Sequence, residues 1–486
     1  MSLSTALNNA YSGLSVMSKS AETVSNNVSN ALTEGYSRQR VEYSASVVAG
    51  VGSGVVIEGI YRSQDAYATR ARLSVDAEVA NLGVLSNVTT RLAEILGDPG
   101  NPTALATQYQ DLETALSTAI NAPDSVALQQ GILFAAKEIT ASFSRISTVT
   151  TQLRTDADAA IAKDIANLNG ALKNVENLNE TIRNMAISGH SVASLEDQRQ
   201  TLIDNVNAIV PIRTVLNERG EIDIFTRGGA VLLNGSAAEL EFTQTSAISP
   251  SMTLSSGALS GISINGKPVE LGAHGGVLAG GSLAAHLDVR DRLAPLFQTQ
   301  LDALAADLIM RFQTPAVDPT LGAGDAGIFT DTGGSFDTLN QVGISQRVSI
   351  NIAVDPASGG QLWRIRDGLG AGSPGVSGTS EQLIRMTNAL EEIVPPSPGI
   401  GITSFLSGTG FAEELTSAWA MQANLMEADH GRNQGRLTVL KVEEQNAIGV
   451  DTDQEMQFLL NIENAYSANA RVISVLDDLM QKLLEI

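Results

Sequence analysis

Apolar residues recur with heptad spacing at both ends of this chain, and this feature constrains the fold more than any other. The N-terminal stripe alternates steps of four and three residues. It comprises Leu3, Leu7, Ala10, Leu14, Met17, Ala21, Val24, Val28 and Ala31. This spacing is typical of a coiled-coil seam, although a surface helix packed on a core has it too. Because chain termini fray unless another element covers them, we expect a partner helix elsewhere in the chain.

The C-terminus supplies a second stripe of the same kind. It comprises Leu459, Ile462, Tyr466, Asn469, Ile473, Leu476, Met480 and Leu483. A lone polar member such as Asn469 often fixes the register of a coiled coil. Thr452, with Glu455 three residues later, predicts a capping box at the start of this helix. We therefore predict that residues 1–35 form a helix that pairs with residues 448–486.

The interior begins with a long region of helical spacing. Residues 36–206 begin with a linker and then contain alanine-rich stretches such as AAIAKDIANLNGALKNVENLNETIRNMA, with the breakers GDPGNP and NAPDS between helical segments. Two later segments, 282–314 and 401–447, have the same helical pattern. We expect them to fold back on residues 36–206 and to complete one helical bundle domain.

Alternating apolar and polar residues appear between the helical segments. EIDIFT, AVLLNG and GISINGKPVEL are separated by glycine and asparagine, and Asn265-Gly266 is a strong hairpin signal. We predict an inserted β-rich outer domain made of residues 207–281 and 315–400. The expected fold class is thus an α+β multidomain protein with terminal coiled-coil helices, a helical bundle domain and an inserted β-rich domain.

Charge and composition exclude several classes of function. The 53 acidic residues exceed the 30 basic ones and give a net charge of −23, so nucleic acid and anionic membrane surfaces would be repelled. The smoothest apolar run, SASVVAGVGSGVVI, is short and glycine-rich, far from the roughly 20 residues of a membrane span. The chain contains no cysteine, which excludes disulfides and thiolate metal sites. Its first 20 residues lack the apolar core of a cleavable signal peptide.

Residues suited to catalysis or ligand binding are poorly represented. The histidines, which are His190, His274, His286 and His430, lack paired ligand spacing. GAGDAG from Gly322 and GAGSPG from Gly370 do not have the strand and helix that a dinucleotide loop requires. The carboxylates of DTDQE, residues 451–455, lack the further ligands of a calcium loop. We predict no catalytic, cofactor-binding or metal site and no small-molecule substrate.

The two ends together resemble a known family. The segment ALNNAYSGLSVMSKSAETVSNNVSNALTEGYSRQRVEY resembles the N-terminal signature of the rod, hook and hook-associated proteins of bacterial flagella, and IGVDTDQEMQFLLNIENAYSANARVISVLDDLMQKLLEI resembles their closing helix. The signature turn consists of Asn26, Asn27, Gly35, Tyr36, Ser37, Arg38 and Gln39. Its Gly-Tyr-Ser-Arg-Gln form and the long helical region that follows are similar to the hook-associated members.

This resemblance implies a structural subunit that joins the flagellar hook to the filament and polymerises through its terminal helices. It implies export in an unfolded state by the flagellar type III apparatus, without a cleaved signal peptide, to an extracellular position at the hook-filament junction. The implied partners are further copies of the chain in a helical ring or tube, the hook subunit on one side, the second junction protein or the filament on the other, and an export chaperone.

Three alternatives remain open from the sequence. A hook or distal rod subunit of the same family would have β structure soon after the Gly-Tyr turn instead of a long helical region. An enzyme that uses the β insert as its catalytic domain would need converging titratable residues. A signalling coiled coil would form a continuous heptad rod without hairpins.

Overall fold

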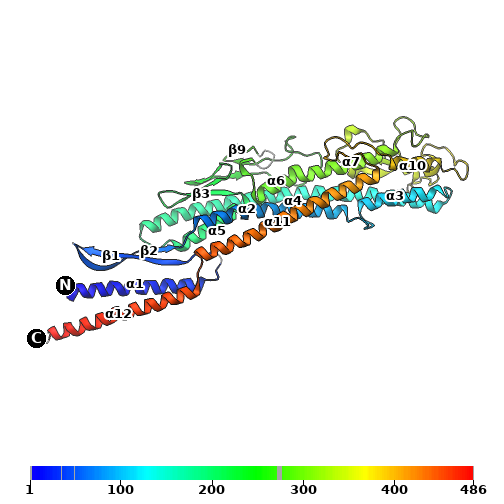
Figure 1. Cartoon of the computed structure of the whole chain (residues 1–486). Coiled ribbons are helices and arrows are strands. Elements are labelled where there is room, and N and C mark those ends of the chain that lie inside the picture. The colour runs from blue at the N-terminus through cyan, green and yellow to red at the C-terminus, as the bar shows by residue number, and fades with distance from the viewer. Residues whose placement is uncertain (1–2, 34, 49, 271–275, 485–486) are drawn as a thin grey trace.

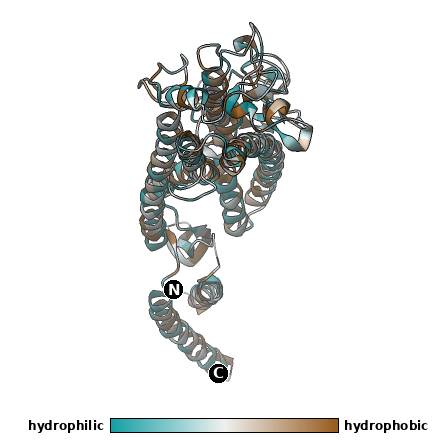
Figure 2. Ribbon diagram, turned by 90° about the vertical axis from the view of Figure 1, so that its right-hand side faces the viewer, coloured by the Kyte–Doolittle hydropathy of each residue, from teal (hydrophilic) through white to brown (hydrophobic). Residues whose placement is uncertain are grey.

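The computed structural model describes residues 3–33, 35–48, 50–270 and 276–484 of an elongated molecule. Both termini lie at the same pole, where α1 (Leu3–Asn30) packs along α12 (Thr452–Leu484) (Figure 1). Seen from the side turned by 90°, this terminal pair lies below the rest of the molecule (Figure 2). The combination of long helices with small sheets confirms the predicted α+β multidomain class.

Long helices form the body of the molecule, which we define as residues 63–448. Its spine is α4 (Val126–Ile187), whose 62 residues span about 90 Å. This helix runs so far because it is rich in alanine and lacks proline, and the Ser125 side chain caps its start by accepting a hydrogen bond from the Leu128 N–H. The other long helices are α2 (Ala66–Leu96), α3 (Leu105–Ile120), α5 (Ala193–Ile209), α7 (Ala294–Phe312), α10 (Glu381–Glu391) and α11 (Gly408–Ile448). No helix in the described ranges is long and apolar enough to cross a membrane.

The larger hydrophobic core lies where α3, α4, α7, α10 and α11 meet, in the half of the body far from the termini. Aliphatic side chains fill most of it, as the low aromatic content requires. The Phe297 and Trp419 rings make an edge contact with centroids 5.0 Å apart. The Trp419 indole N–H donates to the Gln300 side chain at 2.7 Å, so the one polar group of this ring pair is satisfied.

Two small antiparallel sheets lie against α4 between α5 and α6 (Gly281–Asp288) in the chain. Their strands are β3 (Ile212–Leu216), β4 (Ile222–Thr226), β5 (Val231–Asn234), β6 (Ser236–Ala237), β7 (Leu240–Glu241), β8 (Ser263–Ile264) and β9 (Lys267–Pro268). Asn265 and Gly266 both have positive φ, 50° and 72°, and form the tight turn between β8 and β9 that the sequence predicts.

The expected single β-rich domain of residues 207–281 and 315–400 requires correction, because the two segments belong to different cores. Residues 207–209 are still part of α5, and the strands that follow bury Ile224 and Leu233 in a second core against α4 and α5. The segment 315–400 instead buries Phe329 and Val348 in the larger core at the other end of the body.

Segment 315–400 is also poor in strands. It contains only β10 (Phe329–Asp331) and β11 (Val348–Ile350) as a paired ladder. Its other short elements are η3 (Thr338–Asn340), α8 (Ile344–Arg347), η4 (Ile352–Val354), η5 (Pro356–Ser358) and α9 (Arg364–Asp367). A buried carboxylate, rather than a β-ladder, holds part of this segment against α7. Asp302 of α7 accepts hydrogen bonds from the backbone N–H groups of Gly343 and Ser345, at 2.7 and 3.0 Å.

The predicted helix of residues 282–314 is interrupted. Between α6 and α7 lies the π-helical turn η2 (Val289–Leu293), after the 3-10 turn η1 (Gly276–Leu278) that precedes α6. Arg290 in this turn is fully buried, and its Nη1 donates to Oδ1 of the equally buried Asp158 on α4 at 2.8 Å. The extra residue of the π turn places this arginine on the face that packs on α4.

The expected linker after the first helix is a long β-hairpin. β1 (Gln39–Val48) pairs with β2 (Val51–Arg62), and the ribbon lies along α1. The residue types explain this, since QRVEYSASVV and VGSGVVIEGIYR are rich in β-branched and aromatic residues. The helical region therefore begins at α2 rather than directly after the turn.

Candidate functional site

The terminal helices form an antiparallel pair that is separate from both cores of the body. α1 runs from the free end toward the body and α12 returns from the body to the free end (Figure 1). Neither core contains a described residue of α1 or α12. The apolar packing of the pair thus comes from its own contacts and from the hairpin rather than from the cores of the body.

The buried stripe of α1 is displaced from the predicted one. Of the predicted seam residues, Ala10 and Val24 are buried, Leu3, Leu14, Met17 and Ala21 are half-buried, and Leu7 and Val28 are exposed. The buried residues are Ala10, Gly13, Val16, Ser20, Thr23, Val24 and Asn27. The displacement arises because α1 has two neighbours, α12 and the hairpin, and the small residues lie between them.

On α12 the buried residues follow the predicted register. Ile462 and Leu476 are buried, and Leu459, Asn469 and Ile473 are half-buried, whereas Tyr466, Met480 and Leu483 are exposed. The amide of Asn469 lies against Gly13 of α1, where an added Cβ would come within 3.0 Å of it. The predicted polar seam residue therefore lies at a close contact between the two helices, where α1 has a glycine.

The predicted capping box at the start of α12 is wrong. Asp451 caps the helix, because its Oδ1 accepts hydrogen bonds from the backbone N–H groups of Asp453 and Gln454 at 2.9 and 3.2 Å. Glu455 does not turn back to the helix start. Its side chain is buried and points into a polar cluster that ties α12 to the signature turn.

Asn27 is the centre of this cluster, and all of its hydrogen-bonding capacity is used. Its Oδ1 accepts from the Tyr36 hydroxyl at 2.9 Å and from the Gln39 N–H at 3.0 Å. Its Nδ2 donates to the Gln39 carbonyl at 2.8 Å and to Glu455 Oε2 at 3.0 Å. One buried amide thus joins the end of α1, the start of β1 and the first turn of α12.

Arg38 links the same turn to both C-terminal helices. Its Nε donates to Glu455 Oε1 at 2.6 Å, and its backbone N–H donates to the carbonyl of Ile448, the last residue of α11, at 2.8 Å. We call the cluster of Asn27, Tyr36, Arg38, Gln39 and Glu455 the junction.

Burial and the negative charges of Asp197 and Glu455 raise the pKa of Tyr36 in the junction to about 12. Its hydroxyl therefore remains a hydrogen-bond donor at any physiological pH. Gly35, just before it, has φ 80°, and an added Cβ would lie 2.9 Å from Thr201 Oγ1 of α5. Glycine followed by tyrosine is thus explained by the local structure. Asn26, also in the signature, is exposed and does not enter the junction.

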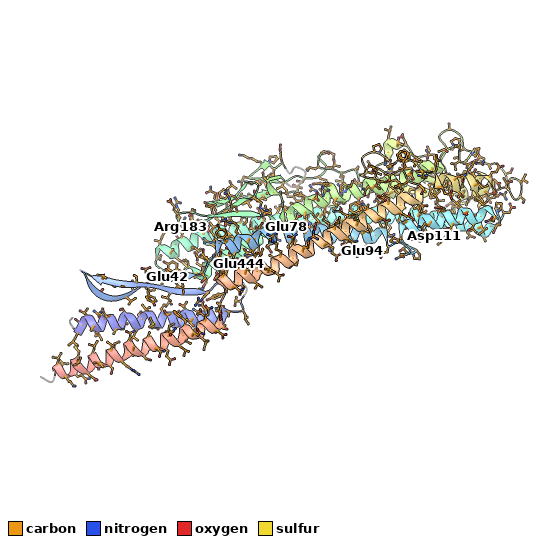
Figure 3. The ribbon with its side chains drawn as sticks, in the orientation of Figure 1. Glu42, Glu78, Glu94, Asp111, Arg183 and Glu444 are labelled. Atoms are coloured by element: carbon orange, nitrogen blue, oxygen red, sulfur yellow. The ribbon has the colours of Figure 1, made fainter. Side chains whose placement is uncertain are left out.

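A second set of ion pairs connects the junction to the body. Asp197 of α5 accepts from the Ser37 N–H and from Arg62 Nη1 at the end of the hairpin, at 3.4 and 3.0 Å. Arg72 of α2 pairs with Asp204 of α5 at 2.9 Å and with Glu444 of α11. Figure 3 places Glu444 near the bend where the body meets the terminal pair. Sequence reasoning missed these partners, because each pair joins residues far apart in the chain.

The remaining sequence candidates are dispersed. The Gly322 and Gly370 loops lie in segment 315–400 and neither opens a long helix. His190 lies in the loop between α4 and α5, His430 is on α11, His286 lies beside Asp164, and His274 is outside the described residues. Within the described ranges no group of three or more histidine or acidic side chains has the geometry to hold a metal ion.

Removal of the Glu455 charge is expected to loosen α12. In Glu455→Gln the Arg38 guanidinium loses its carboxylate partner, and a charge-assisted bond of this kind contributes about 1.5–3 kcal/mol. Since Arg38 is a third exposed and can regain water, we expect the smaller part of this range, or about tenfold faster amide exchange in residues 456–470. Hydrogen exchange measures this, with Glu463→Gln on the exposed face as the matched control. Equal exchange in the two variants would contradict a structural role for the junction.

Two family models match parts of this chain, one in the body and one at the C-terminus. A family model described as flagellar hook-associated protein FlgK helical domain matches residues 89–315, and one described as flagellar basal body rod FlgEFG protein C-terminal matches residues 445–486. The flagellar hook-associated protein 1 of Escherichia coli K12 is 25% identical over 553 residues, which cover 100% of both chains. That of Bacillus subtilis 168 is 21% identical and covers 98% of this chain and 97% of its own.

Two further matches are partial. The hook-associated protein 1 of Salmonella typhimurium LT2 is 26% identical over 57% of this chain and 51% of its own. The flagellar hook junction protein FlgK from Burkholderia pseudomallei has a solved structure with a TM-score of 0.44 and 19% identity, covering 56% of this chain and 48% of that one.

The paired ends and the matched C-terminal model define a structural protein of the bacterial flagellum. Within that class, the helical domain model and the relatives that span the whole chain are all named as flagellar hook-associated proteins, and hook-associated protein 1 is the one that this chain resembles from end to end. The resemblance noted in the sequence is confirmed.

Proposed function

We propose that this chain is the structural subunit that joins the flagellar hook to the filament, and that it polymerises through α1 and α12. One observation carries the second part of the proposal: the terminal pair stands apart from both cores and leaves large apolar side chains exposed, among them Tyr466, Met480 and Leu483. A free-standing domain would cover such residues, whereas a subunit can leave them for its neighbours.

The proposed partners follow from the proposed position of the chain between the hook and the filament. Further copies of the chain form the ring or tube, the hook subunit binds on one side, and the second junction protein or the filament binds on the other. We also propose that an export chaperone binds the chain before secretion and that the chain travels unfolded without cleavage. The absence of cysteine and an aromatic content of only 4% suit a chain that is threaded and refolded.

A strain that lacks this protein tests the function. We expect electron microscopy to show hooks of normal length without filaments, and we expect the intact gene to restore filaments. Absent hooks would favour the alternative of a hook or distal rod subunit. Normal filaments would contradict both proposals.

A further inference from the structure

A second apolar stripe runs along α12, one position before the seam that faces α1. Its members are spaced by 7, 3, 4, 3 and 4 residues, and we call them the second stripe: Phe458, Ala465, Ala468, Val472, Val475 and Leu479. Its four large side chains are not covered. Phe458, Val472, Val475 and Leu479 are 44%, 46%, 57% and 45% exposed.

The second stripe is at positions that a two-stranded coiled coil fills with charge. In such a pair the residues that flank the seam are commonly Glu and Lys. On α12 the charged residues between the junction and Leu479 are Glu463, Arg471, Asp477 and Asp478, and none of them is a member of the second stripe. The sequence of α12 therefore suits a helix with two helical partners.

The chain itself supplies only one of those partners. Among the described elements, α1 is the only one that packs along α12, and the hairpin packs on α1. The second partner must therefore come from another molecule.

Charge favours α1 of another copy as that partner. The chain has a net charge of −23, so most of its surfaces would bring carboxylates toward the second stripe. α1 is an exception, since Lys19 and Glu22 are the only charged residues among its 28 and they pair with each other at 2.8 Å.

α1 also has apolar surface to offer. Its heptad residues Leu7 and Val28 are each 39% exposed, and Leu14, Met17 and Ala21 are only half-buried. Each copy thus has one incompletely covered stripe on α1 and another on α12. Two such different surfaces on identical subunits make a heterologous contact, which repeats around a ring or along a helix.

We infer that the second stripe of α12 binds the half-covered heptad face of α1 from a neighbouring copy. Each α12 then lies between its own α1 and that of its neighbour. This inference rests on the proposed function and specifies which surfaces meet. Because all copies in a ring point the same way, the neighbouring α1 runs antiparallel to α12, as the chain's own α1 does.

Cross-linking between two single-cysteine chains tests the contact. The protein has no cysteine of its own, so a chain with Val475→Cys and a chain with Leu7→Cys or Val28→Cys can be produced in one cell. An intramolecular link is impossible because each chain carries one thiol. After treatment of isolated flagella with a bismaleimide, we expect dimers that contain one chain of each kind. Asp477→Cys, which is exposed and lies two residues further along on the opposite side of α12 from Val475, is the matched control and is expected to give at least tenfold less of the mixed dimer.

The other outcomes overturn the inference. Dimers formed by Val475→Cys chains alone would mean that α12 meets α12, and absence of mixed dimers with both α1 variants in motile cells would mean that something else covers the stripe. A second test is Val475→Asp, for which we expect loss of filaments with unchanged hydrogen exchange within the monomer's body. Normal filaments in Val475→Asp cells would overturn the inference. The proposed function would stand as long as the strain without the protein lacks filaments.

Discussion

Cells whose only copy of this protein carries Leu476→Asp are expected to make hooks without filaments. Leu476 is 9% exposed and lies in the seam between α12 and α1. An aspartate there must either be desolvated or force the helices apart, at a cost of several kcal/mol. Ile473→Asp, one turn earlier on the same stripe, is expected to act in the same way but less strongly, because Ile473 is only half-buried.

The purified Leu476→Asp monomer is expected to unfold at nearly the same temperature as the unmodified protein. The two hydrophobic cores of the body contain no described residue of α12, so the main thermal transition does not depend on this helix. Calorimetry of the monomer and electron microscopy of the cells measure the two effects. Ser474→Asp is the matched control, since it adds the same charge at an exposed position two residues away. A large loss of thermal stability would place α12 in a self-contained domain, and normal filaments would show that the seam is not needed for assembly.

The sequence predicted the pairing of the ends more accurately than the detail of the pair. On α12 the heptad positions match the buried face, because α1 is its one extensive neighbour. On α1 the buried face also includes Gly13, Val16 and Ser20, which no apolar pattern selects. These residues are buried by the hairpin and α12 together, and the number of neighbours of a helix is a tertiary property that periodicity does not contain.

The junction shows that local sequence does not reveal the tertiary partners of polar residues either. Glu455 follows Thr452 at the spacing of a capping box, and from local sequence that prediction was reasonable. Its actual partners, Asn27 and Arg38, are more than 400 residues away in the chain. A buried carboxylate could be recognised only once the fold had brought the two ends together.

The residue types in the sequence identify the β regions, but they do not show which hydrophobic core each region joins. Turn signals such as Asn265-Gly266 identified a hairpin correctly, but they do not tell which helices a strand packs on. The run SASVVAGVGSGVVI, which is too short and too rich in glycine for a membrane span, contributes residues to both β1 and β2. The hairpin also means that β structure after the Gly-Tyr turn does not by itself separate hook-associated proteins from hook and rod subunits.

Arg290→Met is expected to cost the body about 3 kcal/mol of stability, the largest loss of body stability that we predict for a single substitution. Both Arg290 and its partner Asp158 have 0% exposed side chains, so the variant leaves a carboxylate buried without its cation. Removal of one member of a buried ion pair typically costs about 3–5 kcal/mol. We expect the lower end because the Asp158 carboxylate keeps the hydrogen bond from the Thr245 N–H.

A matched control lies two residues further along the chain. Arg292 pairs with Asp288 but is 51% exposed, so Arg292→Met is expected to cost less than about 1 kcal/mol. The double variant Arg290→Met/Asp158→Leu removes both buried charges and is expected to recover most of the loss, since apolar residues of similar volume can replace a buried pair. Urea titration of the three purified proteins gives the free energies of unfolding. If Arg290→Met is no less stable than Arg292→Met, then the buried pair does not hold the π turn against α4, and the interruption between α6 and α7 needs another cause.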